Sequence, residues 1–149
     1  SIINSIGGGF RGLVEGGRYL LARPTILTLA LLKSGMAIKG GIMISGLFDL
    51  RPLRYSFVQP KLQLNYGTIE GQSPLFHLPE SAPHILVSVG AEESAEFRRQ
   101  SRDYLDAWIA AGLNGEYFEQ VGKNHFTAID GFLDPESSLF RKMDEFMRG

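Results

Sequence analysis

The chain has 149 residues, of which 44% are hydrophobic and 21% are charged, a composition that favours a single packed domain over a disordered chain. A net charge of −1 gives no basic surface for nucleic acid, and the lack of cysteine excludes disulfides, thiol catalysis and Cys-based zinc sites. The histidines His77, His84 and His125 have no metal-ligand spacing between them. We therefore expect neither a metal nor a cofactor.

The first 17 residues are rich in glycine and include the run Gly7-Gly8-Gly9. Three interpretations are open for this run. The first is an oxyanion site, because backbone N–H groups would bind an oxyanion. The second is a phosphate loop, which would need a following Gly-Lys-Ser/Thr that is absent. The third, a flexible terminus, is the interpretation we favour. The next residues predict a short strand over 18–22 and a helix over 26–33, with Arg23-Pro24-Thr25 as the turn between them.

After residue 45 the sequence changes from an apolar run to a proline-rich segment. The apolar run over 41–45 predicts a strand that is buried on both faces. Residues 47–83 carry five prolines, so they cannot form one regular element. We expect short helices and loops there, as in a lid or an excursion from the sheet.

Strands and helices then alternate to the end of the chain. Residues 85–89 and 116–121 predict strands, and residues 94–111 predict a helix capped by Ser94, with Trp108 on the stripe that faces the sheet. Asp134-Pro135 fits the N-cap and first position of a last helix. This alternation predicts an α/β fold: a mostly parallel sheet of about four strands with helices on both faces.

Glu93 and His125 each follow one of these predicted strands. Because parallel strands end at the same edge of a sheet, we expect the two side chains within hydrogen-bond reach or one water apart. A carboxylate that orients a histidine is the acid–histidine part of a Ser–acid–His triad. The other interpretation is a solvated carboxylate at a helix N-terminus and a locally bonded loop histidine. Glu92 is the neighbouring alternative, which we expect to point to solvent.

Four segments together resemble the arylformamidase (kynurenine formamidase) and esterase branch of the α/β-hydrolase superfamily. They are residues 45–53, 73–75, 89–101 and 122–126, and they occur in the order and spacing of that family. The resemblance implies a partial α/β-hydrolase fold, with an atypical front over 1–35 and a hydrolase-like portion over 36–149 of one domain. It also implies hydrolysis of a small amide or ester of the N-formylkynurenine type, in tryptophan catabolism, with Glu93 as the catalytic acid and His125 as the catalytic base.

The sequence departs from the family at the nucleophile. The family's Gly-x-Ser-Ala-Gly-Gly-His-Leu elbow is absent, and only Arg23, Pro24 and Thr25 stand between the predicted strand and helix. Thr25 is a weak candidate because its branched side chain is crowded, and Ser5 and Ser45 are weaker, since Ser45 ends a buried strand. We therefore expect a truncated, deleted or frameshifted front part and impaired catalysis. The alternative is a non-catalytic remnant that serves as a binding or dimerisation module.

The remaining expectations concern location and partners. The apolar run over 19–32 is interrupted by Arg23-Pro24 and is too short to cross a bilayer, and no secretory signal is visible. We expect a cytoplasmic protein whose partner is a small molecule rather than nucleic acid or a membrane. A homodimer is left open.

Overall fold

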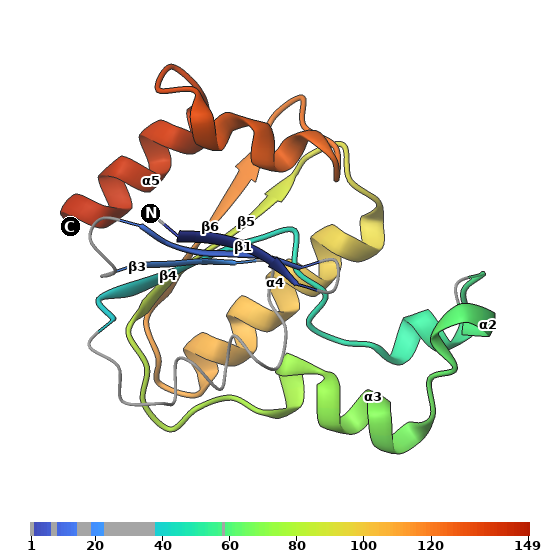
Figure 1. The fold of residues 1–149 in the computed structure, drawn as a ribbon. Helices are drawn as coiled ribbons and strands as arrows, with labels where there is room; N and C mark the ends of the chain where they lie inside the picture. Colours follow the sequence, from blue (N-terminus) through green and yellow to red (C-terminus); the bar gives the residue numbers. More distant parts are fainter. Residues whose placement is uncertain (1, 7–8, 15–18, 23–37, 58) are drawn as a thin grey trace.

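Six strands form one sheet in the order β1-β2-β3-β4-β5-β6, and helices cover both of its faces (Figure 1). The structure is a computed structural model that describes residues 2–6, 9–14, 19–22, 38–57 and 59–149; side chains are described for 38–57, 59–60 and 63–149. The helix predicted over 26–33 lies outside the described residues. Within the described part, every helix lacks the length and apolar character needed to cross a membrane.

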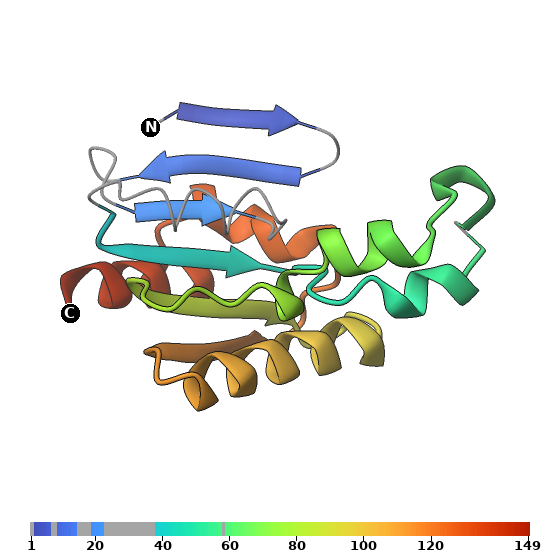
Figure 2. The same cartoon turned by 90° about the horizontal axis from the view of Figure 1, so that it is seen from below.

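The strands are β1 (Ile2–Ile6), β2 (Gly9–Val14), β3 (Tyr19–Ala22), β4 (Gly40–Ile44), β5 (His84–Gly90) and β6 (Gly115–Gln120). Neighbours from β3 to β6 run parallel, whereas β1 pairs antiparallel with β2 and β2 with β3. The α/β class is therefore confirmed. The expected number of strands was too low, because the glycine-rich start, which we expected to be flexible, pairs as β1 and β2 at one edge of the sheet (Figure 2).

The helices divide between the two faces of the sheet. α4 (Ala95–Ala110) lies on one face, and η3 (Thr127–Leu133) and α5 (Ser138–Arg148) lie on the other (Figure 2). Beyond the carboxyl end of β4, four short helices form an excursion from the sheet, made of η1 (Arg51–Tyr55), α2 (Gln59–Leu62), α3 (Tyr66–Gln72) and η2 (Pro74–Phe76). The prediction of short helices and loops in this proline-rich segment is confirmed.

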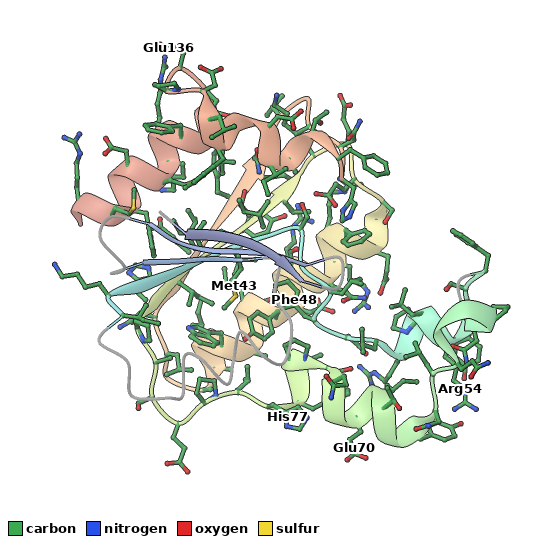
Figure 3. The ribbon with its side chains drawn as sticks, in the orientation of Figure 1. Met43, Phe48, Arg54, Glu70, His77 and Glu136 are labelled. Atoms are coloured by element: carbon green, nitrogen blue, oxygen red, sulfur yellow. The ribbon has the colours of Figure 1, made fainter. Side chains whose placement is uncertain are left out.

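The core has two layers because the side chains of β4 and β5 alternate between the two faces. Met43 and Val87 pack towards α4, together with Phe48, Ile85, Tyr104, Leu105, Trp108 and Leu113. Figure 3 labels Met43 and Phe48 in this layer. Ile42, Ile44 and Leu86 pack on the other face with Ala128, Leu139, Met143 and Phe146. Burial on both faces explains why both strands are continuous apolar runs, and the prediction that Trp108 faces the sheet is confirmed.

The predicted start of the last helix was wrong. α5 begins at Ser138, and its N-cap is Ser137, whose Oγ accepts a hydrogen bond from the Phe140 N–H at 3.0 Å. Asp134 instead ends η3, and its carboxylate accepts from the Glu136 N–H at 3.0 Å. Aspartate readily closes such a local turn, so Asp134-Pro135 belongs to the connection between η3 and α5.

Candidate active site

Glu93 and His125 meet at the carboxyl edge of the sheet. Glu93 lies in the loop after β5 and His125 in the loop after β6, and these two strands are paired neighbours. Nδ1 of His125 lies 2.8 Å from Oε2 of Glu93. The predicted proximity of the two side chains is confirmed. Glu92 is exposed, as expected, so the next residue along the chain is the one that reaches the histidine.

The carboxylate of Glu93 is fully buried and receives hydrogen bonds on both oxygens. Oε1 accepts from the Gly90 N–H at 2.9 Å and from the Ser45 hydroxyl, while Oε2 faces His125. A buried carboxylate needs such partners to offset the loss of hydration. Because a carboxylate only accepts, the proton between Glu93 and the ring belongs to Nδ1, which leaves Nε2 as the basic nitrogen of the neutral ring.

Ser45 acts as a partner of this carboxylate. It follows β4 directly, is 2% exposed, and has φ of 51°, in the left-handed region that residues other than glycine rarely adopt. Its N–H donates to the Ser88 carbonyl on β5 at 2.8 Å, while its hydroxyl bonds Glu93. The sequence suggests Ser45 only as a weak candidate nucleophile, and the structure places its hydroxyl on the acid. Ser45 follows β4, the neighbour of β5, and this position in the sequence is the signal that indicates a role beside Glu93.

The imidazole of His125 is held between aromatic rings at the edge of solvent. The Phe97 ring, from the first turn of α4, lies 4.4 Å away between centroids, and the Phe126 ring lies edge-on at 5.8 Å. The His125 side chain is 30% exposed, and Phe126 is 83% exposed. The ring is therefore fixed by its contacts yet is accessible to a small molecule.

The loops that carry Glu93 and His125 are tied together by backbone contacts. The Ala91 N–H donates to the Gln120 carbonyl at 2.8 Å, and the Glu92 N–H donates to the Lys123 carbonyl at 2.9 Å. A Cβ on Gly90 would lie only 2.1 Å from the Lys123 carbonyl oxygen, so this close approach requires glycine.

Gly122 and Asn124 shape the histidine loop itself. Gly122 has φ of 71°, a conformation that favours glycine. The Asn124 side chain accepts from the N–H groups of Phe126 and Thr127 at 2.9 and 3.1 Å. Gly122 and Asn124 thus determine the conformation of the loop that carries His125.

The other residues singled out in the sequence do not join this pair. His77 bonds the Glu70 carbonyl at 2.7 Å, and His84 packs edge-on against Phe146. Ser5 is in β1, at the other end of the strand order, and Thr25 lies outside the described residues. Among the residues that the structure describes, no group of three or more His, Asp or Glu side chains is placed to hold a metal ion.

Comparison with known proteins supports the resemblance seen in the sequence. No family model matches the chain. It is 31% identical over 111 residues to a kynurenine formamidase of Danio rerio, covering 71% of this chain and 38% of the relative, and 29% identical over 116 residues to that of Salmo salar, covering 74% and 40%. The chain thus spans about two fifths of the length of these curated relatives.

Solved structures give the fold. A candidate thioesterase from Silicibacter sp. superposes with a TM-score of 0.62 at 28% identity, covering 72% of this chain and 39% of the other. Esterase 2 of Thermogutta terrifontis superposes with a TM-score of 0.53 at 18% identity, covering 75% and 41%, which is a likeness of fold alone. The chain has the α/β-hydrolase fold. Its sequence is similar to that of the kynurenine formamidases.

Within this fold, two of the sequence blocks that carry the resemblance contact each other. The amide of Gln100 in α4 accepts at 2.9 Å from the N–H groups of both Phe48 and Asp49, and it donates at 2.9 Å to Glu96. Residues 45–53 are thereby fixed against the helix that follows Glu93. The segment is therefore held at two points, by the bond from Ser45 to Glu93 and by the two bonds to Gln100.

Asp49 is the charged anchor of that segment. Its side chain is 4% exposed and pairs with Arg51, whose Nη2 lies 2.7 Å from Oδ2. Burial alone would raise the pKa of Asp49, but the hydrogen bonds and positive charge of Arg51 lower it overall. Asp49 therefore stays ionised at neutral pH and fixes the start of η1.

Proposed function

We propose that this chain carries the acid and base of a Ser–acid–His hydrolase site for a small amide or ester of the N-formylkynurenine type. Glu93 is the acid, and His125 is the general base and then the general acid. The observation that carries the proposal is the 2.8 Å contact between Glu93 Oε2 and His125 Nδ1 at the ends of adjacent parallel strands. The similarity to kynurenine formamidases supports the substrate class.

The chemistry follows from the tautomer that Glu93 imposes. Nε2 of His125 takes the proton of the attacking hydroxyl while the oxygen of that hydroxyl bonds the carbonyl carbon of the substrate. Glu93 stabilises the imidazolium that forms. The same proton then goes to the leaving nitrogen or oxygen as its bond to that carbon breaks. Water repeats the attack on the acyl group and regenerates the hydroxyl.

The chain itself is expected to be a poor catalyst, because its sequence lacks the serine elbow of the family. Loss of a triad nucleophile costs about 10⁶-fold in kcat, and loss of one oxyanion donor costs about 10²–10³-fold. We expect the purified chain to hydrolyse 4-nitrophenyl acetate or N-formylkynurenine no more than marginally above a His125→Ala control.

Thr25→Ala separates the other outcomes of this assay. Fast turnover that Thr25→Ala abolishes would make Thr25 the nucleophile. Fast turnover that survives both Thr25→Ala and His125→Ala would refute the assignment of the site. The alternative of a non-catalytic module gains support if neither substrate is turned over and neither binds.

A further inference from the structure

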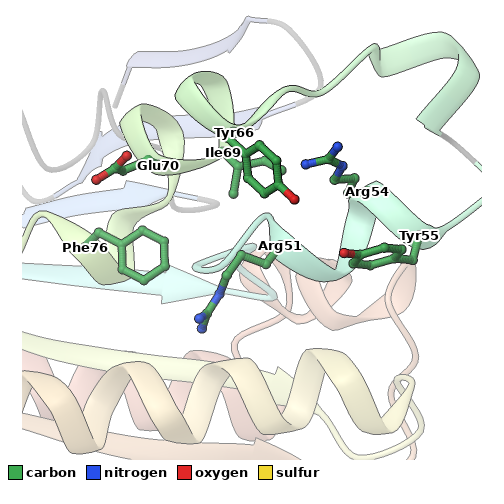
Figure 4. A pocket seen from close by; sticks show the side chains of 7 residues that line it. All are labelled: Arg51, Arg54, Tyr55, Tyr66, Ile69, Glu70 and Phe76. Carbon is green, nitrogen blue, oxygen red and sulfur yellow. The ribbon is translucent and has the colours of Figure 1, made fainter.

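A cavity lies in the excursion, and neither Glu93 nor His125 lines it. It measures about 520 Å³, within the usual range of roughly 300–1,000 Å³ for small-molecule sites. It lies between η1, α3 and η2, as Figure 4 shows. Its lining combines two cations and three aromatic rings with one aliphatic and one acidic side chain: Arg51, Arg54, Tyr55, Tyr66, Phe76, Ile69 and Glu70.

Arg54 is the polar group of this cavity whose hydrogen bonds are incomplete. Its Nη1 is buried and has no hydrogen-bond partner among the residues that the structure describes. Its guanidinium lies over the Tyr66 ring, 3.9 Å from the centroid. A guanidinium that stacks on a ring through its face bonds acceptors through its edge. Leaving a buried donor of a charged group unpaired is costly, so this N–H favours an anionic acceptor. Arg51, by contrast, is paired with Asp49.

The aromatic rings that line the cavity are exposed. Tyr55, Tyr66 and Phe76 are 85%, 73% and 41% exposed, and all three border the cavity. Exposed aromatic side chains gathered around a pocket are typical of ligand sites, where they stack against a planar group. Glu70 also borders the cavity, but its carboxylate points away from Arg54 (Figure 4).

We propose that this cavity binds a small planar aromatic carboxylate. The carboxylate bonds the Arg54 guanidinium, and the ring stacks among Tyr55, Tyr66 and Phe76. The positive charge of Arg54 and its unpaired Nη1 favour an anionic group, and the exposed rings favour a planar one. This proposal does not rest on the hydrolase activity, because the cavity shares no residue with the Glu93–His125 pair.

The test is a calorimetric titration of the full chain with 2-naphthoate and, separately, with its neutral amide, 2-naphthamide. A hydrogen bond to a charged group corresponds to about a tenfold to hundredfold difference in affinity. We expect saturable binding of 2-naphthoate with an affinity at least about tenfold above that of the amide. Arg54→Gln should abolish that preference, whereas Arg141→Gln, a matched change at an exposed arginine of α5, should preserve it.

Tyr66 tests the stacking part of the proposal. Tyr66→Phe keeps the ring and should keep the affinity, whereas Tyr66→Ala should lower it about tenfold. Circular dichroism melts confirm that each variant is folded, and amide NMR shifts of the wild type locate the ligand without any substitution. Equal affinity for acid and amide, equal loss in Arg54→Gln and Arg141→Gln, no saturable binding, or shifts confined outside residues 51–76 would each overturn the proposal.

Discussion

Ser45 combines a left-handed backbone with a hydroxyl that bonds the buried carboxylate of Glu93. Backbone strain in a residue other than glycine persists only where its surroundings hold it, and such residues gather at functional sites. We interpret Ser45 as a positioning residue, since it touches Glu93 and acts on His125 only through that carboxylate.

Ser45→Ala should loosen the link between Glu93 and His125. Alanine keeps the Cβ, so the backbone strain is unchanged, while one of the hydrogen bonds to the carboxylate is lost at a cost of about 1.5–3 kcal/mol in unfolding free energy. Nitrogen-15 NMR of the neutral His125 ring should show the Nδ1–H tautomer dominating in the wild type and a mixture in the variant.

Ser88→Ala is the matched control for this measurement. Ser88 is also buried, but its Oγ accepts from the Gln120 amide at 3.0 Å and makes no contact with Glu93. Its removal should leave the tautomer unchanged. A tautomer ratio in Ser45→Ala identical to that of the wild type would refute the positioning role.

At the scale of an element, α4 is held to the sheet by one aromatic stripe. The Tyr104 ring stacks on Phe48 at 4.1 Å and lies 5.8 Å from Trp108, whose Nε1–H donates to the Asn114 carbonyl at 2.9 Å. Trp108→Ala should lower the unfolding free energy by about 3–5 kcal/mol, enough to unfold a marginal domain. Urea denaturation measures this change.

Ile109 is the control on the same helix. It is 51% exposed, against 0% for Trp108, so Ile109→Ala should change the unfolding free energy by less than about 1 kcal/mol. Equal melting temperatures for the wild type and Trp108→Ala would contradict the packing described here.

Asp49, which fixes the start of η1, should make the unfolding free energy depend on pH. The folded-state pKa of Asp49 is lowered, so its contribution is fully present above the unfolded-state value of about 3.9 and is lost as pH falls through the folded-state pKa. The difference in unfolding free energy between the wild type and Asp49→Asn should be constant near pH 7 and shrink below about pH 4.

Denaturant titrations at pH 7, 5, 4 and 3 measure this difference. Glu136→Gln removes an exposed pair with Arg141 and should have little effect at any of these pH values. A difference for Asp49→Asn that does not change with pH would show that its charge is not what anchors η1.

At the scale of the whole molecule, the sequence predicts the parts that follow from chain order and periodicity. Consecutive parallel strands usually lie side by side, so Glu93 and His125 could be placed together from their positions after two such strands. The apolar stripe of α4 likewise follows from its 3.6-residue repeat.

Other parts depend on contacts that no local pattern reveals. The pairing of β1 with β2 stabilises a glycine-rich segment whose own preferences favour a flexible chain. The bond from Ser45 to Glu93 joins residues 48 positions apart. The cavity lined by Arg54 depends on how the three short helices η1, α3 and η2 pack, and the prolines of residues 47–83 remove the periodicity that would have indicated it.

The contacts between the Glu93 and His125 loops imply that one opening event, the separation of the two loops, exposes both of the amides that join them. The Ala91 and Glu92 amides donate to carbonyls at the end of β6 and in the histidine loop, so neither can exchange its hydrogen with solvent until both loops separate. Their deuterium uptake should share one rate, slower than that of the exposed amides of the excursion. The acid and the base therefore keep their alignment for as long as these two contacts hold.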